Sequence, residues 1–171
     1  YYNRFISTYP TVFDLAKAKD QTVFKLWEGL GYYNRCRNLL ATAKEIVKTF
    51  NGKFPNDYET LLTLKGVGPY TAAAIASFAF NAPHAVLDGN VFRVIARYEG
   101  IEVPTDTTAG KKIFETRAAA LLDKKRAGLY NQAIMDFGAT VCKPLAPTCT
   151  ICPLQKTCVA HATAQVNQLP I

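Results

Sequence analysis

The chain has 171 residues, of which 49% are apolar and 19% are charged, a balance that excludes a disordered or fibrous protein. Lys and Arg number 20 against 13 Asp and Glu, so the formal net charge is +7. A basic surface favours polyanions, by attraction to phosphates and release of their counterions, although many globular proteins are mildly basic. The longest apolar run, residues 70–80, is too short to span a bilayer, and no signal peptide is visible.

Apolar residues that recur every three or four positions predict several helices in the first half of the chain. Thr11 followed by Asp14 is typical of a capped helix start, and Asp20 is expected to cap a second helix. The apolar positions within residues 39–50 predict an amphipathic helix. A shorter helix is predicted for residues 58–64.

The second half of the chain continues the helical pattern. Pro69 stands where proline is tolerated, at the first position of a helix that reaches about Phe80. This helix is apolar on all sides, so we expect it to be central. Asp88 is expected to cap the next helix, and two more are predicted at about 109–122 and 129–139. No segment alternates between apolar and polar residues as a strand does, so the chain is predicted to be all-α.

Four of the five cysteines crowd together near the C-terminus, at Cys142, Cys149, Cys152 and Cys158. Four thiolates in so short a segment can surround one metal centre, because the chain must fold back on itself there. Disulfides are the alternative, but they are typical of secreted proteins and no secretory signal is visible. Spacing alone does not separate zinc from a [4Fe–4S] cluster. Cys36, the fifth cysteine, is expected to be a small core residue.

Residues 64–72, Leu-Lys-Gly-Val-Gly-Pro-Tyr-Thr-Ala, join two predicted helices through a glycine-rich turn. The two glycines permit positive φ angles and close approach by another backbone. Successive amides at the start of the second helix can then hold a phosphate oxygen. The alternative is an ordinary turn between two helices. A Gly-x-Gly that follows a leucine and opens an alanine-rich helix favours the helix-hairpin-helix arrangement.

Three features occur in order along the chain: the glycine hairpin, Leu-Asp-Gly-Asn-Val at residues 87–91, and the Cys-x6-Cys-x2-Cys-x5-Cys spacing. Together they resemble the helix-hairpin-helix DNA glycosylase superfamily, which includes endonuclease III. Gly-Leu-Gly-Tyr-Tyr-Asn-Arg at residues 29–35 and Asn-Gln-Ala-Ile-Met-Asp-Phe-Gly at residues 131–138 are similar to its MutY-like adenine glycosylases. The resemblance covers essentially the whole chain.

The resemblance implies a function in DNA base-excision repair. Members of this family remove adenine mispaired with oxidised guanine, or with guanine, by flipping the base out of double-stranded DNA and hydrolysing its N-glycosidic bond. We accordingly expect an intracellular protein in a reducing compartment, acting as a monomer without a membrane. The fold implied is the helix-hairpin-helix DNA glycosylase fold, with a helical barrel lobe and an iron–sulfur cluster lobe.

The resemblance also implies a cofactor and a domain organisation. The cysteine spacing resembles the superfamily's [4Fe–4S] loop, with Cys142, Cys149, Cys152 and Cys158 as ligands. Four cysteine ligands leave no open position on the metal, so we expect the cluster to be structural. One lobe is expected over residues 1–82, with the hairpin at about 57–80, and a second over 83–171, with the cluster loop at 142–158.

Three residues are implied for the catalytic pocket. Asp88 aligns with the catalytic aspartate, whose carboxylate can stabilise the positive charge that builds on the sugar, or trap it covalently. Tyr70 stands where bifunctional relatives carry a lysine nucleophile, and a tyrosine cannot form a Schiff base, so we expect a monofunctional hydrolase. Asn90 is similar to an asparagine that positions the water or the aspartate. The alternative for Asp88 is a plain helix cap, and both roles can hold together.

Further residues are implied for contacts with DNA. Gln132 resembles a residue on the adenine-contacting wall, where an amide can donate and accept at once, and Asp136 is expected to orient its neighbours. Tyr32 matches an aromatic residue that is inserted beside the oxidised guanine, which offsets the cost of unstacking. A solvated helix face is the alternative for the first two, and a buried aromatic for Tyr32. Phosphates are expected at the hairpin residues Lys65, Gly66, Val67 and Gly68, with weaker contacts from the basic segment 111–126.

The sequence departs from the family in two places. The family's general acid, a glutamate in a Glu-x-x-Leu-Gln-Gln-Thr-like segment, has no match in this chain, and neither has the C-terminal domain that recognises oxidised guanine. We therefore expect this chain alone to have little or no glycosylase activity. Two alternatives stay open: a mismatch thymine glycosylase of the same fold, and a non-catalytic helix-hairpin-helix module that only binds DNA.

Overall fold

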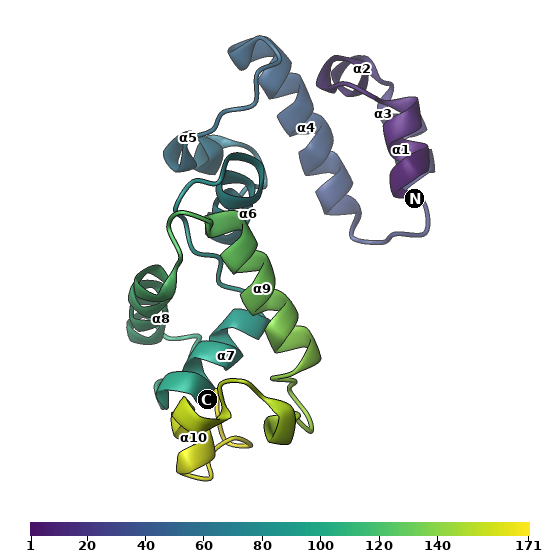
Figure 1. Ribbon diagram of the computed structural model, residues 1–171. Helices are drawn as coiled ribbons and strands as arrows, with labels where there is room; N and C mark the ends of the chain where they lie inside the picture. The colour runs from purple at the N-terminus through teal and green to yellow at the C-terminus, as the bar shows by residue number, and fades with distance from the viewer. The chain divides into compact units, whose positions relative to one another are not determined.

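The computed structural model describes all 171 residues, and every regular element in it is a helix (Figure 1). The all-α prediction is confirmed. The chain divides into two compact units, Tyr1–Pro69 and Tyr70–Ile171. This division lies upstream of the linker at residues 81–87 in which the sequence suggests a break, and the lobes 1–82 and 83–171 remain a prediction. None of the helices combines the length and apolarity needed to cross a bilayer.

The first unit is built around one long helix. Shorter helices α2 and α3 pack against α4, and a cluster of buried side chains lies between them. The cluster consists of Leu15, Val23, Cys36, Leu40 and Ala43, so Cys36 is a core residue as expected. The helices of this unit are α1 (Tyr2–Thr8), α2 (Val12–Lys17), α3 (Asp20–Trp27), α4 (Tyr33–Phe50) and α5 (Tyr58–Thr63).

The helix ends in this unit show which local signals the sequence carries. Thr11 and Asp14 form the predicted capping box at the start of α2. Asp20 lies within the first turn of α3, and Lys19 takes the N-cap position. The helix predicted for residues 39–50 begins earlier, at Tyr33, because its first turn is mostly polar and adds nothing to the apolar period.

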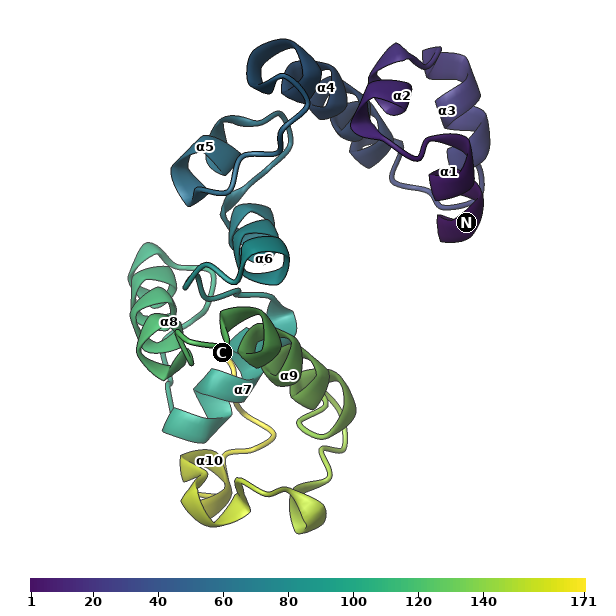
Figure 2. The ribbon, with the colours of Figure 1, turned by 45° about the horizontal axis from the view of Figure 1, so that its top comes forward.

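The second unit holds the remaining helices and the cysteine-rich segment. Helix α7 packs against α8, α9 and α10 (Figures 1 and 2). The elements are α6 (Pro69–Phe80), α7 (Gly89–Glu99), α8 (Thr108–Leu121), α9 (Ala127–Thr140), two 3-10 turns η1 (Cys149–Ile151) and η2 (Gln155–Thr157), and α10 (Val159–Ala162). Pro69 opens α6, and Asp88 caps α7, as predicted.

Helix α7, and not α6, is the most deeply buried helix of this unit. It buries six residues, including the guanidinium-bearing Arg93 and Arg97. Helix α6 buries Ala72, Ala73, Ala76 and Ser77, but Phe78 and Phe80 at its end are exposed. The expectation that the uniformly apolar helix is central does not hold within this unit, because the amphipathic α7 supplies the larger packing surface.

Two asparagines hold the linker between α6 and α7 against α9. Asn81 donates to the Lys125 carbonyl and accepts from the Gly128 amide. Asn131, which is fully buried, donates to the His84 carbonyl and accepts from the Val86 amide. Side-chain amides can replace the missing backbone pairing of a loop in this way. The linker therefore delivers residue 88 to a defined place beside α9.

Candidate functional site

The Asp88 carboxylate is held at the N-terminus of α7. Its Oδ1 accepts from the Val91 amide at 2.8 Å, and its Oδ2 accepts from the Asn90 side-chain amide at 3.0 Å. Asp88 is half-buried. The carboxylate thus lies at the positive end of the helix dipole, where a negative charge is stabilised. Each oxygen keeps a further lone pair, so the cap role leaves the carboxylate able to act on a substrate.

A buried arginine joins this carboxylate to the cysteine-rich segment. Arg93 donates to the Asn90 side chain and the Gly138 carbonyl from the same nitrogen, both at 2.8 Å. Its Nε donates to the Cys142 carbonyl at 2.8 Å. Burial lowers the pKa of Arg93, while Cys142 and Asp88 oppose that effect. The series Asp88–Asn90–Arg93–Cys142 thus runs through one continuous set of hydrogen bonds.

Gly138 and Arg93 are structural parts of this site that the sequence reasoning did not single out. A Cβ at position 138 would lie 2.7 Å from the Asn90 Cβ and 3.0 Å from its carbonyl oxygen. Only glycine lets α9 approach α7 this closely. A glycine within the last turn of the helix predicted at 129–139 is the signal that could have revealed it. Arg93 gave no such signal, because its charge sits among the apolar positions of α7.

Gln132 and Asp136 form a pair on the exposed surface of α9. The Gln132 Nε2 donates to the Asp136 Oδ1 at 2.9 Å. This bond leaves the Gln132 carbonyl oxygen and one N–H available to a ligand. The bond holds the Gln132 side chain against Asp136, and the orienting role expected of Asp136 remains a prediction. Tyr70, near the start of α6, is partly exposed and its hydroxyl makes no hydrogen bond.

The glycine hairpin between α5 and α6 has two different glycines. Gly66 has a φ of +77°, and a Cβ there would overlap the Asn38 side chain. Gly68 has no such strain and faces open space. The Thr42 hydroxyl donates to the Lys65 carbonyl at 3.0 Å and so holds the turn. Between the two glycines, Val67 is half-buried. Gly66 thus shapes the hairpin, whereas Gly68 leaves room for another molecule.

Tyr32 is presented on the surface of the first unit. Its side chain is 79% exposed, and its φ of +46° places a non-glycine residue in the left-handed region. The predicted site residues are divided between the two units. The first unit contains Tyr32, Lys65 and the hairpin glycines, and the second contains Tyr70, Asp88, Asn90, Gln132 and Asp136.

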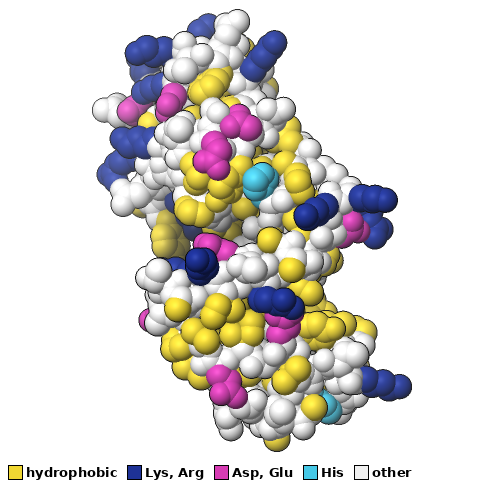
Figure 3. Space-filling model, turned by 90° about the vertical axis from the view of Figure 1, so that its left-hand side faces the viewer, with side chains coloured by type: hydrophobic (Ala, Val, Ile, Leu, Met, Phe, Trp, Pro, Cys, Tyr) yellow, Lys and Arg dark blue, Asp and Glu magenta, His cyan; other side chains and the backbone are white.

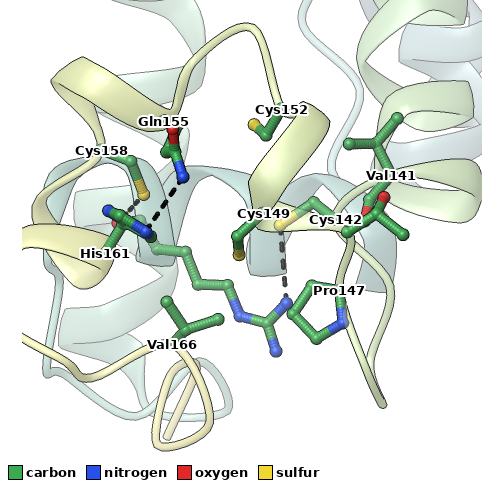
Figure 4. Close-up of a pocket in the computed structure, with 11 residues that line it drawn as sticks. Val141, Cys142, Pro147, Cys149, Cys152, Gln155, Cys158, His161 and Val166 are labelled. Carbon is green, nitrogen blue, oxygen red and sulfur yellow. Dashed lines mark hydrogen bonds between the residues drawn. The ribbon is translucent and has the colours of Figure 1, made fainter.

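Four cysteines line one small cavity in the second unit (Figure 4). The volume open to water inside this cavity is about 30 Å³, and none of the four thiols is in a disulfide. No group of three or more histidine, cysteine or acidic side chains is arranged to hold a metal ion. Burial raises the pKa of Cys149, the three other thiols raise it further, and Arg97 lowers it. The cavity is formed by Cys142, Cys149, Cys152 and Cys158 together with Arg97 and His161.

Arg97 brings a positive charge into this cavity without a carboxylate partner. Its side chain is buried, and it donates to the backbone carbonyls of Leu169 and Lys143 at 2.9 and 2.8 Å. Its Nη1 also donates to the Cys142 sulfur at 3.5 Å. A dashed line in Figure 4 ends at this sulfur. A buried cation is costly unless compensated, and in this structure backbone carbonyls and the Cys142 sulfur surround the Arg97 guanidinium. Four cysteines are the donor type that an iron–sulfur cluster uses, but here their side chains are not arranged around a metal ion.

The basic residues of segment 111–126 are engaged to different degrees. Arg117 pairs with both Glu99 oxygens, which raises the pKa of Arg117, and Arg126 pairs with Asp123. Lys124 and Lys125 are exposed and form no ion pair. On the face drawn in Figure 3, Lys and Arg side chains project at several separate places with acidic side chains among them.

Residues 1–118 match the family described as HhH-GPD superfamily base excision DNA repair protein. The chain belongs to this superfamily. The fold described above is accordingly the helix-hairpin-helix DNA glycosylase fold, and the family resemblance read from the hairpin, residues 87–91 and the cysteine spacing is confirmed.

Among curated proteins, this superfamily member is similar to several adenine DNA glycosylases. It is 44% identical to that of Mus musculus over 99% of this chain and 33% of the relative. It is 42% identical to that of Homo sapiens over 99% of this chain and 31% of the relative, and 37% identical to that of Buchnera aphidicola over 100% and 49%. The chain spans a third to a half of the length of these relatives.

Solved structures resemble the same fold. A thermostable thymine-DNA glycosylase matches with a TM-score of 0.85 and 29% identity, covering 95% of this chain and 75% of that one. An endonuclease III in a non-covalent complex with DNA matches with a TM-score of 0.80 and 26% identity over the same shares.

Proposed function

We propose that the protein is a monofunctional adenine DNA glycosylase that acts on adenine opposite oxidised guanine or guanine in double-stranded DNA. The observation that carries the proposal is the Asp88 carboxylate, held at the start of α7 by Val91 and Asn90 and backed by Arg93. Identity of 37–44% to adenine glycosylases over nearly the whole chain supports adenine as the base.

Within residues 1–171, Asp88 is the side chain that contributes most to the chemistry of base release. Cleavage of the N-glycosidic bond leaves positive charge on the deoxyribose, and the carboxylate stabilises that charge until water adds to the sugar. Adenine leaves with the bonding electrons and takes up a proton. Asn90 keeps one oxygen of Asp88 oriented while the second faces the Val91 amide. Tyr70 provides no amine, so the reaction ends in hydrolysis and not in strand cleavage through a Schiff base.

Gln132 is proposed to select the flipped base. With one of its N–H groups bound to Asp136, Gln132 keeps a carbonyl oxygen and one N–H for a ligand. The exocyclic amine of adenine would donate to that oxygen, and a ring nitrogen of adenine would accept from the N–H. Thymine presents a carbonyl where adenine has its amine, so it would leave the Gln132 oxygen without that donor.

The hairpin, Tyr32 and the basic segment are proposed to bind the duplex. Lys65 and the backbone at Gly66, Val67 and Gly68 would hold phosphates, and Tyr32 would insert into the duplex beside the oxidised guanine. The four cysteines would hold a [4Fe–4S] cluster that ties together the segment following α9. When bound, the cluster supplies covalent cross-linking of this segment, and we assign it no step in base release.

The proposal is tested by single-turnover base release with the complete natural protein on duplexes that contain A opposite oxidised guanine, A opposite G, or T opposite G. We expect release of adenine, with at least a hundredfold loss in Asp88→Asn, because asparagine keeps the helix cap but not the charge. Asp57→Asn, which changes the equivalent cap of α5, is the matched control and should release adenine normally. Faster release of thymine than of adenine would support the mismatch thymine glycosylase instead, a possibility favoured by the TM-score of 0.85. Binding without release of either base would indicate a DNA-binding module.

A further inference from the structure

Tyr32 adopts a backbone conformation that its own side chain does not favour. Gly29, Gly31 and Tyr32 all have positive φ angles, of +93°, +69° and +46°, and only Tyr32 carries a side chain. Its ring is 79% exposed, so burial does not compensate for the strain. A strained residue persists only where its surroundings fix it. The question is therefore which groups fix Tyr32.

Trp27 fixes the backbone that leads into Tyr32. Its indole Nε1 donates to the Gly31 carbonyl at 2.9 Å, which is the oxygen of the peptide unit that joins Gly31 to Tyr32. The indole is anchored in turn, because its ring packs edge-to-face on Phe5 at 6.2 Å and lies against the core cluster of the first unit. The hydrogen bond thus sets the plane of the peptide from a rigid base.

Arg35 fixes the ring. Its guanidinium carbon lies 5.2 Å from the centroid of the Tyr32 ring, within the range of a cation–π contact, and its amide donates to the Tyr32 carbonyl at 2.8 Å. Arg35 forms no ion pair or other side-chain hydrogen bond. Arg37, two residues further along the same helix, instead bonds Asn34 and lies over the Phe24 ring. The two arginines carry the same charge and serve different aromatic residues.

We propose that Trp27 and Arg35 are positioning residues that hold Tyr32 ready for insertion into the duplex, an inference that rests on the proposed function. Trp27 sets the direction of the residue, and Arg35 restricts its ring to one orientation. Because the ring is ordered before DNA binds, less conformational entropy is lost when the ring inserts into the base stack. The binding energy is then available to open the base pair.

The test uses the complete natural protein with a duplex that carries 2-aminopurine, a fluorescent adenine analogue, opposite guanine. Base flipping is read from the rise in fluorescence at saturating protein. We expect Tyr32→Ala, Trp27→Phe and Arg35→Gln each to lower the flipping equilibrium severalfold, with Arg37→Gln unchanged. Trp27→Phe retains an aromatic ring in this place but loses the hydrogen-bond donor and part of the ring volume. Thermal melting of each variant confirms that the protein is folded. Because Arg35 is exposed, Arg35→Gln is expected to leave the packing of the core unchanged.

Two further measurements separate positioning from a direct phosphate contact. In the Tyr32→Ala background, Arg35→Gln should have no added effect on flipping, because there is no ring left to orient. The slope of log affinity against log salt should be the same for Arg35→Gln as for Arg37→Gln. An additive loss, or a slope reduced only by Arg35→Gln, would overturn the proposal in favour of phosphate binding.

The outcome also distinguishes this inference from the proposed function. If Tyr32→Ala impairs flipping and neither Trp27→Phe nor Arg35→Gln does, the positioning roles are wrong and the function stands. If the unmodified protein flips no base, the proposed function is wrong and the positioning roles fall with it.

Discussion

At the scale of single residues, Arg93 has the most extensive structural role. Its guanidinium is buried, and nearby negative groups compensate only partly for its charge. Arg93 makes hydrogen bonds to Gly89, Asn90, Gly138 and Cys142, which come from two helices and the cysteine-rich segment. The bond to the Gly138 carbonyl is buried, and the other three are partly buried. An arginine suits the position because its planar group presents five donors in fixed directions.

We expect Arg93→Met to lower the free energy of unfolding by about 3 kcal/mol, because the buried Gly138 carbonyl and the partly buried Asn90 and Cys142 acceptors lose a charged donor, at about 1–3 kcal/mol for a buried group left unpaired. Base release should fall as well, since Asn90 loses the bond that orients it toward Asp88. Denaturant unfolding and single-turnover assays measure the two effects. Arg4→Met is the control: that guanidinium is exposed and bonds one carbonyl, so a change within about 0.5 kcal/mol is expected. Equal effects of the two substitutions would contradict the bridging role of Arg93.

At the scale of elements, the sequence predicted helix starts well where the capping residue is local. Each capping side chain accepts from the backbone amide three residues further along the chain: Thr11 from Asp14, Asp57 from Thr60, and Asp88 from Val91. A short window of sequence therefore contains the whole interaction. It could not predict α1, which has no side-chain cap. Nor could it reveal the bond between Asn131 and Val86 or the proximity of Gly138 to Asn90, because each joins residues that are more than forty positions apart. Contacts of this kind follow from packing and not from a local pattern.

The hairpin offers a test at the same scale, because its two glycines serve different purposes. Gly66→Ala should destabilise the protein by about 1–3 kcal/mol, since alanine is strained at a φ of +77° and would overlap Asn38. Gly68→Ala should leave stability nearly unchanged, because that position is unstrained and open. We expect Gly68→Ala nevertheless to weaken DNA binding, since its methyl group would occupy the space that a phosphate approaches. Unfolding and DNA-binding titrations of both variants distinguish the two roles, and normal affinity in Gly68→Ala would show that no phosphate comes close to residue 68.

At the scale of the whole molecule, a net charge of +7 predicts that DNA binding weakens as the salt concentration rises. The Lys and Arg side chains are expected to contribute unequally to this salt dependence. Lys124 and Lys125 are exposed and unpaired, whereas Arg117 is held by both Glu99 oxygens. We expect the Lys124→Gln, Lys125→Gln double variant to flatten the slope of log affinity against log salt, by about 0.9 for each phosphate that the variant no longer neutralises. Arg117→Gln should leave the slope unchanged. Identical slopes in the double variant and the unmodified protein would mean that the segment does not touch DNA.

The five cysteines allow the proposed cofactor to be tested, because they lie in two different environments: four line the cavity of the second unit, and one lies in the core of the first. Cys149 lines the cavity with three other thiols and Arg97, whereas Cys36 is fully buried in the core of the first unit. If the cavity holds a [4Fe–4S] cluster, the purified protein should absorb at about 400 nm and contain about four irons per chain. Cys149→Ser should remove most of this absorbance and iron, while Cys36→Ala should retain both, even where it costs some packing energy. Equimolar zinc without visible absorbance would identify a zinc centre, because zinc has a filled d shell and gives no such band. Loss of the absorbance in Cys36→Ala alone would instead show that the cavity in the second unit is not the site of the metal.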